Sequence, residues 1–217
     1  MRRKFIAVMA VVIGLSAIFV IEQALETLNT LTRVERERDT WQRPEDILRR
    51  LDLRPGETVV DLGSGAGYFA LKVASRVAPG GLVLAVDLRR QSLTFLWIRA
   101  RLAGAWNLQV IRGEVDDPRL PAVPVDAVLI ANTYHELAAP KAVVKALFTT
   151  MRSGGTLVVV DRAAHGQGEA HAHHEIAAGD AERTIRQQGF EPVFRDDRFI
   201  DRATEEDLWW LIVFRKP

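Results

Sequence analysis

The 217-residue sequence contains no cysteine at all. This absence excludes disulfide bonds, thiolate nucleophiles and cysteine-bound zinc, while it says nothing about the cellular compartment. The sequence also lacks an excess of charge of either sign, because its 29 basic residues nearly balance its 28 acidic residues. A nucleic-acid partner would call for a strongly positive surface field, so we predict no binding to nucleic acid.

Charged residues are also missing from Phe5 to Ile21, directly after the basic residues 2–4. Such a stretch reaches about 26 Å as a helix, which is the short end of what spans a bilayer. No small-residue cleavage site follows it, so we predict a retained membrane anchor over residues 1–28. A secretory signal peptide has the same basic start and apolar run, and export after cleavage is therefore the alternative.

The most informative stretch begins with the apolar, β-branched residues 58–62, which predict a buried parallel strand. Three glycines spaced two apart follow it, Gly63, Gly65 and Gly67, and a helical pattern begins at Tyr68. Glycine is needed where the backbone takes a positive φ or where a ligand approaches the bare main chain. The unpaired N–H groups at the start of the helix can then face a ligand above the strand end.

The glycine spacing separates two classes of ligand. Dinucleotide-binding folds use G-x-G-x-x-G/A, whose last small residue lets helix and strand pack closely. Tyr68 stands at that position, so an NAD-dependent oxidoreductase is the disfavoured alternative. The G-x-G-x-G pattern, with Asp61 two residues before it, resembles motif I of the class I S-adenosylmethionine-dependent methyltransferases. A glycine-rich turn that binds nothing is the remaining alternative.

Six more apolar segments indicate strands, at residues 82–87, 107–112, 125–132, 156–161, 190–195 and 208–215. Helical patterns separate the parallel strands, and right-handed crossovers then give one continuous sheet. No helix of useful length separates the last two strands, so they should pair as an antiparallel hairpin. The predicted fold class is α/β: a doubly wound, seven-stranded, mostly parallel sheet with a C-terminal antiparallel hairpin, preceded by an N-terminal hydrophobic helix. The resemblance implies the strand order 3-2-1-4-5-7-6.

The sequence divides into three predicted parts, and the resemblance covers roughly Trp41 to Pro217 and leaves the anchor outside it. The anchor or signal-like helix covers residues 1–28, and a charged helical linker that also lids the cofactor covers residues 29–53. The methyltransferase domain covers residues 54–217. Trp41 lies in the linker, where it either contacts the substrate or packs the linker against the domain.

The resemblance implies S-adenosyl-L-methionine as the cofactor. Asp87 ends the second strand, where a carboxylate can accept hydrogen bonds from both ribose hydroxyls. An Asp87 that only caps the next helix is the alternative without a ligand. Glu114 matches the acid that the family places at the adenine, with Asp116 as the near alternative. The predicted cofactor-binding residues are Asp61, Gly63, Ser64, Gly65, Gly67, Tyr68, Asp87, Leu88, Glu114, Val115 and Asn132.

The segment after the fourth strand supplies the catalytic candidates, Tyr134 and His135. Ligands of open α/β sheets bind at the carboxyl ends of the strands, so this segment should face the reactive methyl group. His135 can act as a general base near neutral pH, with Glu136 orienting it, or it is a histidine without chemistry at the start of a helix. No Asn-Pro-Pro-Tyr loop follows Asn132, which disfavours methylation of adenine or glutamine-type amides.

Four of the five histidines lie within residues 165–174. In the methyltransferases that this sequence resembles, such a segment lies near the acceptor pocket, so His173 and His174 are predicted to contact the substrate. A solvated loop and a divalent metal site are the alternatives. Because no H-E-x-x-H or comparable signature is present, we predict no metal.

These features predict an S-adenosylmethionine-dependent methyltransferase with a small-molecule acceptor, lipophilic if the N-terminal helix holds the chain at a membrane. A membrane-tethered protein that binds S-adenosylmethionine without catalysis is the alternative. The basic start favours an exported domain, whereas S-adenosylmethionine is made and held in the cytoplasm. Arginines after the apolar run offset the bias, so we expect a membrane-anchored enzyme that faces the cytoplasm.

Overall fold

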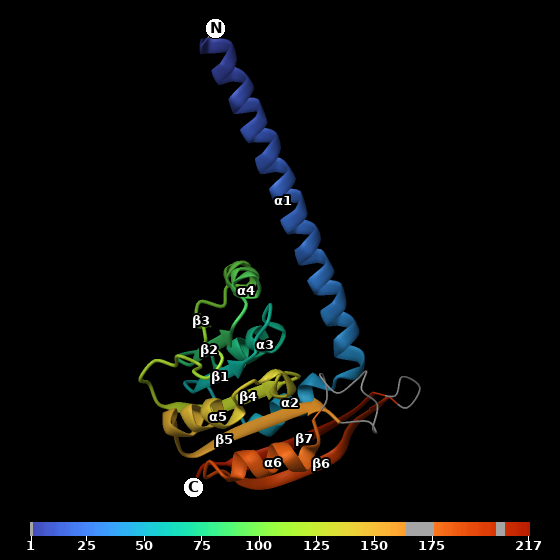
Figure 1. Ribbon diagram of the computed structural model, residues 1–217, viewed down its shortest axis with the longest axis vertical. Coiled ribbons are helices and arrows are strands. Elements are labelled where there is room, and N and C mark those ends of the chain that lie inside the picture. The colour runs from blue at the N-terminus through green and yellow to red at the C-terminus, as the bar shows by residue number, and fades with distance from the viewer. Residues whose placement is uncertain (1, 164–175, 203–206) are drawn as a thin grey trace. The chain divides into compact units, whose positions relative to one another are not determined.

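The structure is a computed structural model that describes residues 2–163, 176–202 and 207–217 (Figure 1). It divides the chain into two units, Met1–Trp41 and Gln42–Pro217. The first unit is a single helix, α1 (Arg2–Trp41), which continues without a break through the predicted boundary at residue 28. The second unit holds the sheet and the remaining helices.

The predicted transmembrane anchor is not supported. Within the described part of the chain, no helix is both long enough and apolar enough to cross a bilayer. The side chains of residues 1–8, 10–12 and 17, which belong to the predicted anchor, lie outside what the structure describes. In the described part of α1, Glu22 and Glu26 continue the helix with charge directly after the apolar run.

The second unit is built on one seven-stranded sheet of order β3-β2-β1-β4-β5-β7-β6, which confirms the predicted order. The strands are β1 (Thr58–Leu62), β2 (Leu82–Asp87), β3 (Leu108–Arg112), β4 (Val125–Ala131), β5 (Met151–Arg162), β6 (Glu191–Arg202) and β7 (Asp207–Arg215). Neighbours from β3 to β5 pair in parallel. β7 pairs antiparallel with β5 and with β6, so the predicted hairpin is also confirmed.

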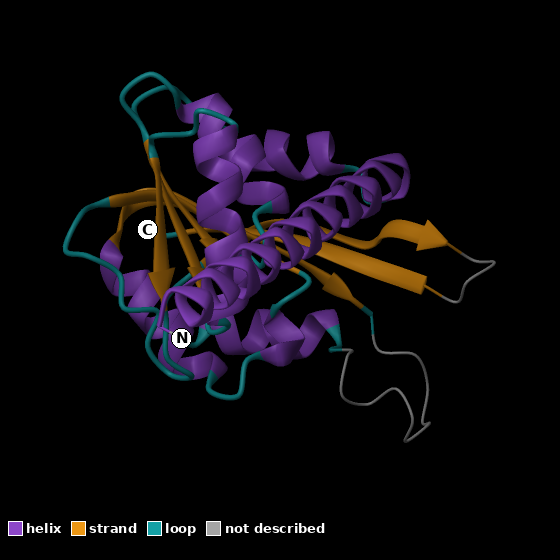
Figure 2. Cartoon of the chain, turned by 90° about the horizontal axis from the view of Figure 1, so that it is seen from above, coloured by secondary structure: helices purple, strands orange, loops and turns teal. Residues whose placement is uncertain are grey.

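Helices cover both faces of the sheet, which Figure 2 shows from above. They are α2 (Pro44–Leu51), α3 (Tyr68–Val77), α4 (Arg90–Leu102), the short 3₁₀ helix η1 (Tyr134–Glu136), α5 (Pro140–Thr150) and α6 (Ala178–Arg186). Because both faces are covered, the parallel strands are apolar almost throughout instead of alternating. Val60, Leu84 and Val128 in the central strands are fully buried.

β5 begins five residues earlier than the predicted start at Thr156. Met151 pairs with Val125 of β4 before a shift in register, and Gly154 N–H donates to the Lys216 carbonyl at 2.7 Å. Residues 152–155 are therefore held in the sheet by hydrogen bonds of Gly154 and Gly155 to the backbone of Lys216. This difference lies at the amino end of β5, away from the strand ends that form the site.

The carboxyl ends of β1, β2, β4 and β5 share one edge of the sheet. Strand order reverses at β1, because β2 lies on one side of it and β4 on the other. Crossovers leave the sheet in opposite directions at such a point, and the strand ends then open a crevice for a ligand. The residues that follow these four strands are therefore the candidates for a ligand site.

Candidate active site

The turn after β1 is held against the end of β2. The N–H groups of Gly63 and Ser64 both donate to the Val86 carbonyl, at 2.8 and 3.0 Å. Gly63 has a φ of 75°, and a Cβ atom there would lie 2.2 Å from the side chain of Thr133. Only glycine fits a backbone with this φ and this neighbour. Gly63 therefore brings the turn after β1 into contact with the segment after β4.

Asp87 at the end of β2 joins the same turn. Its Oδ2 accepts a hydrogen bond from Gly65 N–H at 2.9 Å, and its Oδ1 accepts one from Arg89 N–H at 2.8 Å. The carboxylate is almost completely buried. The two positions predicted to hold opposite ends of one ligand thus lie directly beside each other. Each carboxylate oxygen has a second lone pair with which it can accept another donor.

A cavity of about 330 Å³ opens beside this contact. It is lined by Leu62, Gly63, Val86, Asp87, Leu88, Arg89, Gly113, Glu114, Val115, Pro118, Thr133, Glu136, Leu137, Ala138 and Val143. Five of the predicted cofactor residues, Gly63, Asp87, Leu88, Glu114 and Val115, are among them. This volume is within the range of small-molecule and cofactor sites, and most of the lining is apolar.

The other predicted cofactor residues surround the turn without being part of this lining. Asp61 and Ser64 are buried, Gly65 bonds to Asp87, and Gly67 packs against Leu96 of α4. Tyr68, also buried, begins α3 and contacts the Phe69 ring edge-on, at 4.7 Å between ring centroids. Their roles toward a cofactor stay predictions.

Asn132, the first residue after β4, is strained at the edge of the site. Its φ of 53° is in the left-handed region, which non-glycine residues adopt at a cost. Its Oδ1 and the Ser64 hydroxyl oxygen are buried, and neither has a hydrogen-bond partner within the described part of the chain. Buried polar atoms normally have such partners, so these two atoms fit a site that receives a ligand with polar groups.

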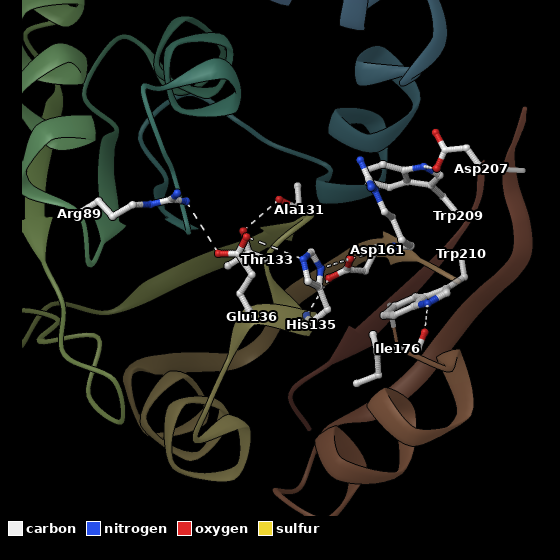
Figure 3. Close-up of polar contacts among 11 residues, drawn as sticks. Arg89, Ala131, Thr133, His135, Glu136, Asp161, Ile176, Asp207, Trp209 and Trp210 are labelled. Atoms are coloured by element: carbon white, nitrogen blue, oxygen red, sulfur yellow. Dashed lines mark hydrogen bonds and ion pairs between the residues drawn. The ribbon is translucent and has the colours of Figure 1, made fainter. Parts of the chain in front are cut away.

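His135 forms a pair with Asp161, which lies at the end of β5 (Figure 3). His135 Nδ1 and Asp161 Oδ1 are 2.7 Å apart, and the His135 backbone N–H donates to Asp161 Oδ2 at 3.1 Å. The side chains are 4% and 0% exposed. The predicted orienting residue, Glu136, lies on the other side of the ring, with its Oε1 3.8 Å from Nε2. Asp161 therefore fixes the imidazole more closely than Glu136 does.

The sequence of residues 53–198 matches the family model described as a methyltransferase domain. The chain belongs to this family. The class I S-adenosylmethionine-dependent methyltransferase fold, and S-adenosyl-L-methionine as its cofactor, follow from that membership and from the strand order. The glycine turn, Asp87 and the cavity between them fit this cofactor, which joins an amino acid to a nucleoside.

The printed names of individual relatives of this chain differ in the substrate that they state. Over 113 residues the chain is 30% identical to a protein-L-isoaspartate O-methyltransferase of Ignicoccus hospitalis, covering 52% of this chain and 51% of that protein. Over 111 residues it is 32% identical to an arsenite methyltransferase of Halobacterium salinarum, covering 50% of this chain and 28% of that protein. The chain thus spans about half, or less, of the length of these relatives.

Solved structures support the fold. A methyltransferase from Aquifex aeolicus superposes with a TM-score of 0.70 at 20% identity, covering 81% of this chain and 90% of that one. A geranyl diphosphate methyltransferase in complex with the cofactor superposes with a TM-score of 0.68 at 19% identity, covering 81% and 85%. At such identities the likeness concerns the fold alone.

The surroundings of His135 set its protonation. Burial lowers the pKa of the imidazole, but the hydrogen bond and negative charge of Asp161, helped by the charge of Glu136, raise it further than burial lowers it. The pKa of His135 in the methyltransferase therefore lies above its ordinary value of about 6.5. An imidazole with this environment can take up a proton near neutral pH.

Tyr134, the other predicted catalytic residue, points into the core of the methyltransferase. It is 2% exposed and belongs to the apolar cluster that includes α5 and α6. Burial raises the pKa of Tyr134 to about 12, and the nearby Thr184 hydroxyl opposes part of that rise. At this pKa the phenol stays protonated at neutral pH, so packing explains its position better than proton transfer does.

The structure does not test the predicted substrate residues, Trp41, His173 and His174. Trp41 ends α1 and thus belongs to the other unit. His173 and His174 lie outside the described residues, and so does the rest of the histidine-rich segment. Where the structure does describe the chain, it shows no group of three metal-ligating side chains. The assignments of all three residues stay predictions.

Among the residues that line or support the site but are absent from the predicted set, three make polar contacts there: Arg89, Thr133 and Asp161. Asp161 could have been found by the rule that identified Asp87, because it is also an acid at the carboxyl end of a strand. Ala131 at the end of β4 pairs with Val160, which places the residues after β4 beside Asp161. Thr133 and Arg89 carry no comparable signal in the sequence.

Proposed function

We propose that this methyltransferase transfers the methyl group of S-adenosyl-L-methionine to a hydroxyl of a small, lipophilic acceptor, with His135 as the general base. The single observation that carries the proposal is the buried pair of His135 and Asp161 next to the cofactor cavity. Glu136, which follows His135, and Thr133, two residues before it, both line that cavity. His135 itself is not among the residues that line the cavity, so contact between its imidazole and the acceptor is part of the proposal.

Binding of the cofactor is assigned to one side of the cavity. Asp87 would accept hydrogen bonds from the ribose hydroxyls, and Glu114 would accept one from the adenine amino group, with Val115 against the ring. Glu114 is held by Arg119, whose Nη2 lies 2.9 Å from its Oε1. The backbone around Gly63 would approach the methionine end. The bound cofactor supplies an electrophilic methyl group on sulfur, and the cavity walls orient it and exclude water.

His135 takes up the proton of the acceptor. A neutral imidazole that donates Nδ1–H to Asp161 carries its basic lone pair on Nε2. Asp161 holds the ring in this tautomer and stabilises the imidazolium that forms when the acceptor hydroxyl loses its proton. The bound cofactor would supply the methyl group to the hydroxyl oxygen, and its sulfur would leave with the electrons of the broken carbon–sulfur bond. The products are the methyl ether and S-adenosylhomocysteine.

The class of acceptor is inferred from the cavity wall. Part of the cavity wall is an apolar surface formed by Leu62, Val86, Leu137, Ala138 and Val143. Such a wall favours an acceptor with a substantial apolar part. Similar proteins include a nocamycin O-methyltransferase of Saccharothrix syringae, 33% identical over 82 residues that cover 38% of this chain and 29% of that protein, so an oxygen acceptor has a precedent by name.

The experiment is incubation of the purified full chain with cofactor carrying a labelled methyl group and with separate organic and aqueous extracts of cells. We expect a labelled methyl ether in the organic extract, formed together with S-adenosylhomocysteine. A His135→Gln variant should bind the cofactor and leave the acceptor unlabelled. Label confined to proteins or water-soluble products would contradict the lipophilic acceptor, and binding without any transfer would contradict catalysis.

We further propose that the chain works at the cytoplasmic face of a membrane. The uncharged sequence from Phe5 to Ile21 and the exposed Ile13, Leu15 and Phe19 of α1 support this location. A reporter enzyme fused to the C-terminus should be active only in its cytoplasmic form, and the fusion should sediment with the membranes at low salt. Activity of an export-dependent reporter would contradict the orientation, and recovery of the fusion in the soluble fraction would contradict the membrane location.

A further inference from the structure

Three large apolar side chains are exposed together at the edge of the second unit formed by α4 and the turn before β3. Trp97, Leu102 and Trp106 are 50%, 75% and 70% exposed. Single exposed apolar residues are common on protein surfaces, but a group with two tryptophans is not, because each indole leaves a large apolar area in water. This group, Trp97, Leu102 and Trp106, is called the tryptophan patch below.

The same segment has an unusual charge. Between Asp87 and Glu114 the sequence contains five arginines, Arg89, Arg90, Arg99, Arg101 and Arg112, and no acidic residue or lysine. The whole chain, by contrast, carries 29 basic and 28 acidic residues. Arg89 lies 3.7 Å from Asp87 and 3.8 Å from Glu136, so these acids partly compensate its charge. Arg90 and Arg101 are exposed on α4 and give this face a local excess of positive charge.

Arginine and tryptophan are interleaved on this face. Arg90, Thr94, Trp97 and Arg101 are all exposed and follow each other three or four residues apart, so they form one stripe along α4. The Arg101 guanidinium lies over both indoles, with its carbon 5.5 Å from the Trp97 ring centroid and 4.6 Å from that of Trp106. The stripe thus holds apolar rings and fixed positive charge within one contact area.

We propose that the tryptophan patch and its arginines bind the surface of an anionic phospholipid bilayer. Indoles prefer the boundary between headgroups and acyl chains, while arginines pair with lipid phosphates. The positive charge of the segment complements an anionic headgroup layer. A single-stranded nucleic acid is disfavoured, because bases need open ring faces for stacking and Arg101 lies over both indoles. The proposal concerns the second unit and is independent of α1.

The contact can be measured with the full chain and vesicles of phosphatidylglycerol and phosphatidylcholine that carry brominated acyl chains, which quench tryptophan at close range. We expect the vesicles to quench part of the emission, and a Trp97→Phe/Trp106→Phe variant to lose that part. Trp209 and Trp210 are each 1% exposed and give a background that both proteins share. Trp41 is likewise present in both proteins, so any signal from α1 cancels.

The charge requirement has a matched control. Arg90→Gln/Arg101→Gln should weaken the quenching titration by about fivefold for each arginine, because a basic residue near an anionic surface contributes on the order of 1 kcal/mol. Arg183→Gln/Arg186→Gln removes two exposed arginines from α6 and should leave the titration unchanged. Raising the salt concentration should weaken the quenching, since screening acts on exposed charges.

Three results would overturn the proposal. One is equal quenching of the wild type and the Trp97→Phe/Trp106→Phe variant. Another is equal quenching by vesicles of phosphatidylcholine alone, which would show that binding does not require an anionic lipid. The third is the absence of vesicle quenching together with a shift in emission on adding an oligonucleotide, which would assign the patch to a nucleic acid.

Discussion

The two sides of the active site are built in different ways. On the cofactor side, the turn after β1 and the end of β2 are joined by backbone hydrogen bonds to Val86 and by the bond from Gly65 N–H to Asp87. On the side that we propose receives the acceptor, a side-chain pair, His135 and Asp161, joins the segment after β4 to the end of β5. Gly63 and Thr133 form the contact between these two sides.

This difference explains which binding sites a short sequence motif can reveal. The cofactor side depends on backbone shape, and a backbone that must bend with positive φ or admit a neighbour demands glycine at fixed spacing. The acceptor side depends on side chains 26 residues apart that only the register of β4 and β5 brings together. A shared cofactor can thus be read from a motif, whereas the acceptor chemistry needs the structure.

Substitution of His135 should separate the two sides most strongly. A His135→Ala variant should lose turnover by about 100-fold or more, because a positioned general base contributes on that order. Its dissociation constant for S-adenosylmethionine should stay unchanged, because the cofactor side keeps all its contacts. Steady-state kinetics and calorimetry give the two quantities. Turnover equal to the wild type would reduce His135 to a packing residue.

The contact between the two sides can be tested with a pair of glycines. Gly65→Ala should cost roughly 1 kcal/mol in the free energy of unfolding, because its φ of 53° is left-handed but its Cβ would meet open space. Gly63→Ala should cost about 3 kcal/mol, since its Cβ would also overlap Thr133.

Urea unfolding measures both costs, and Gly63→Ala/Thr133→Gly should recover the part that is due to overlap. Equal costs for the two alanine variants would show that the close approach of Gly63 to Thr133 does not constrain the site.

Asp161 should control the pH dependence of the acceptor side. Because the pKa of His135 is raised, the neutral base forms only above the ordinary range, and the acid limb of the rate profile lies there. Asp161→Asn removes the negative charge that raises the pKa of His135, while burial continues to lower that pKa. The acid limb should therefore move to lower pH. Turnover at its plateau should fall by about tenfold as the ring loses its orienting partner.

Glu136→Gln serves as the comparison, because the charge of Glu136 raises the pKa of His135 through a weaker interaction. It should shift the acid limb in the same direction by less. An unchanged profile for Asp161→Asn would contradict the role of the pair.

Tyr134 should give the smallest effect. Its phenol lies in the core and its pKa is raised to about 12, so the hydroxyl transfers no proton at neutral pH. A Tyr134→Phe variant keeps the packed ring, and its turnover should stay within about threefold of the wild type. A loss comparable with that of His135→Ala would restore Tyr134 to the catalytic group.

Much of the fold could be predicted because its signals are local. The uninterrupted apolar strands and the missing helix before β7 were sufficient for the sheet and its hairpin. The family resemblance carried by the glycine turn supplied the strand order. The early start of β5 could not be predicted, since it depends on pairing of Gly154 with the distant Lys216. At the site, Asp87 followed from its place at a strand end, but the choice of Asp161 over Glu136 as the partner of His135 needed the fold of η1.

The most direct test of the account is a calorimetric titration of S-adenosylmethionine into the full chain and into Asp87→Asn. Asp116→Asn is the control, because Asp116 is an exposed acid of the neighbouring loop that is not among the residues lining the cavity. We expect one cofactor site per chain. Its affinity should be about 100-fold weaker in Asp87→Asn, because charge-assisted hydrogen bonds are lost, and the affinity of Asp116→Asn should equal that of the wild type. Equal affinity of the wild type and Asp87→Asn would contradict it.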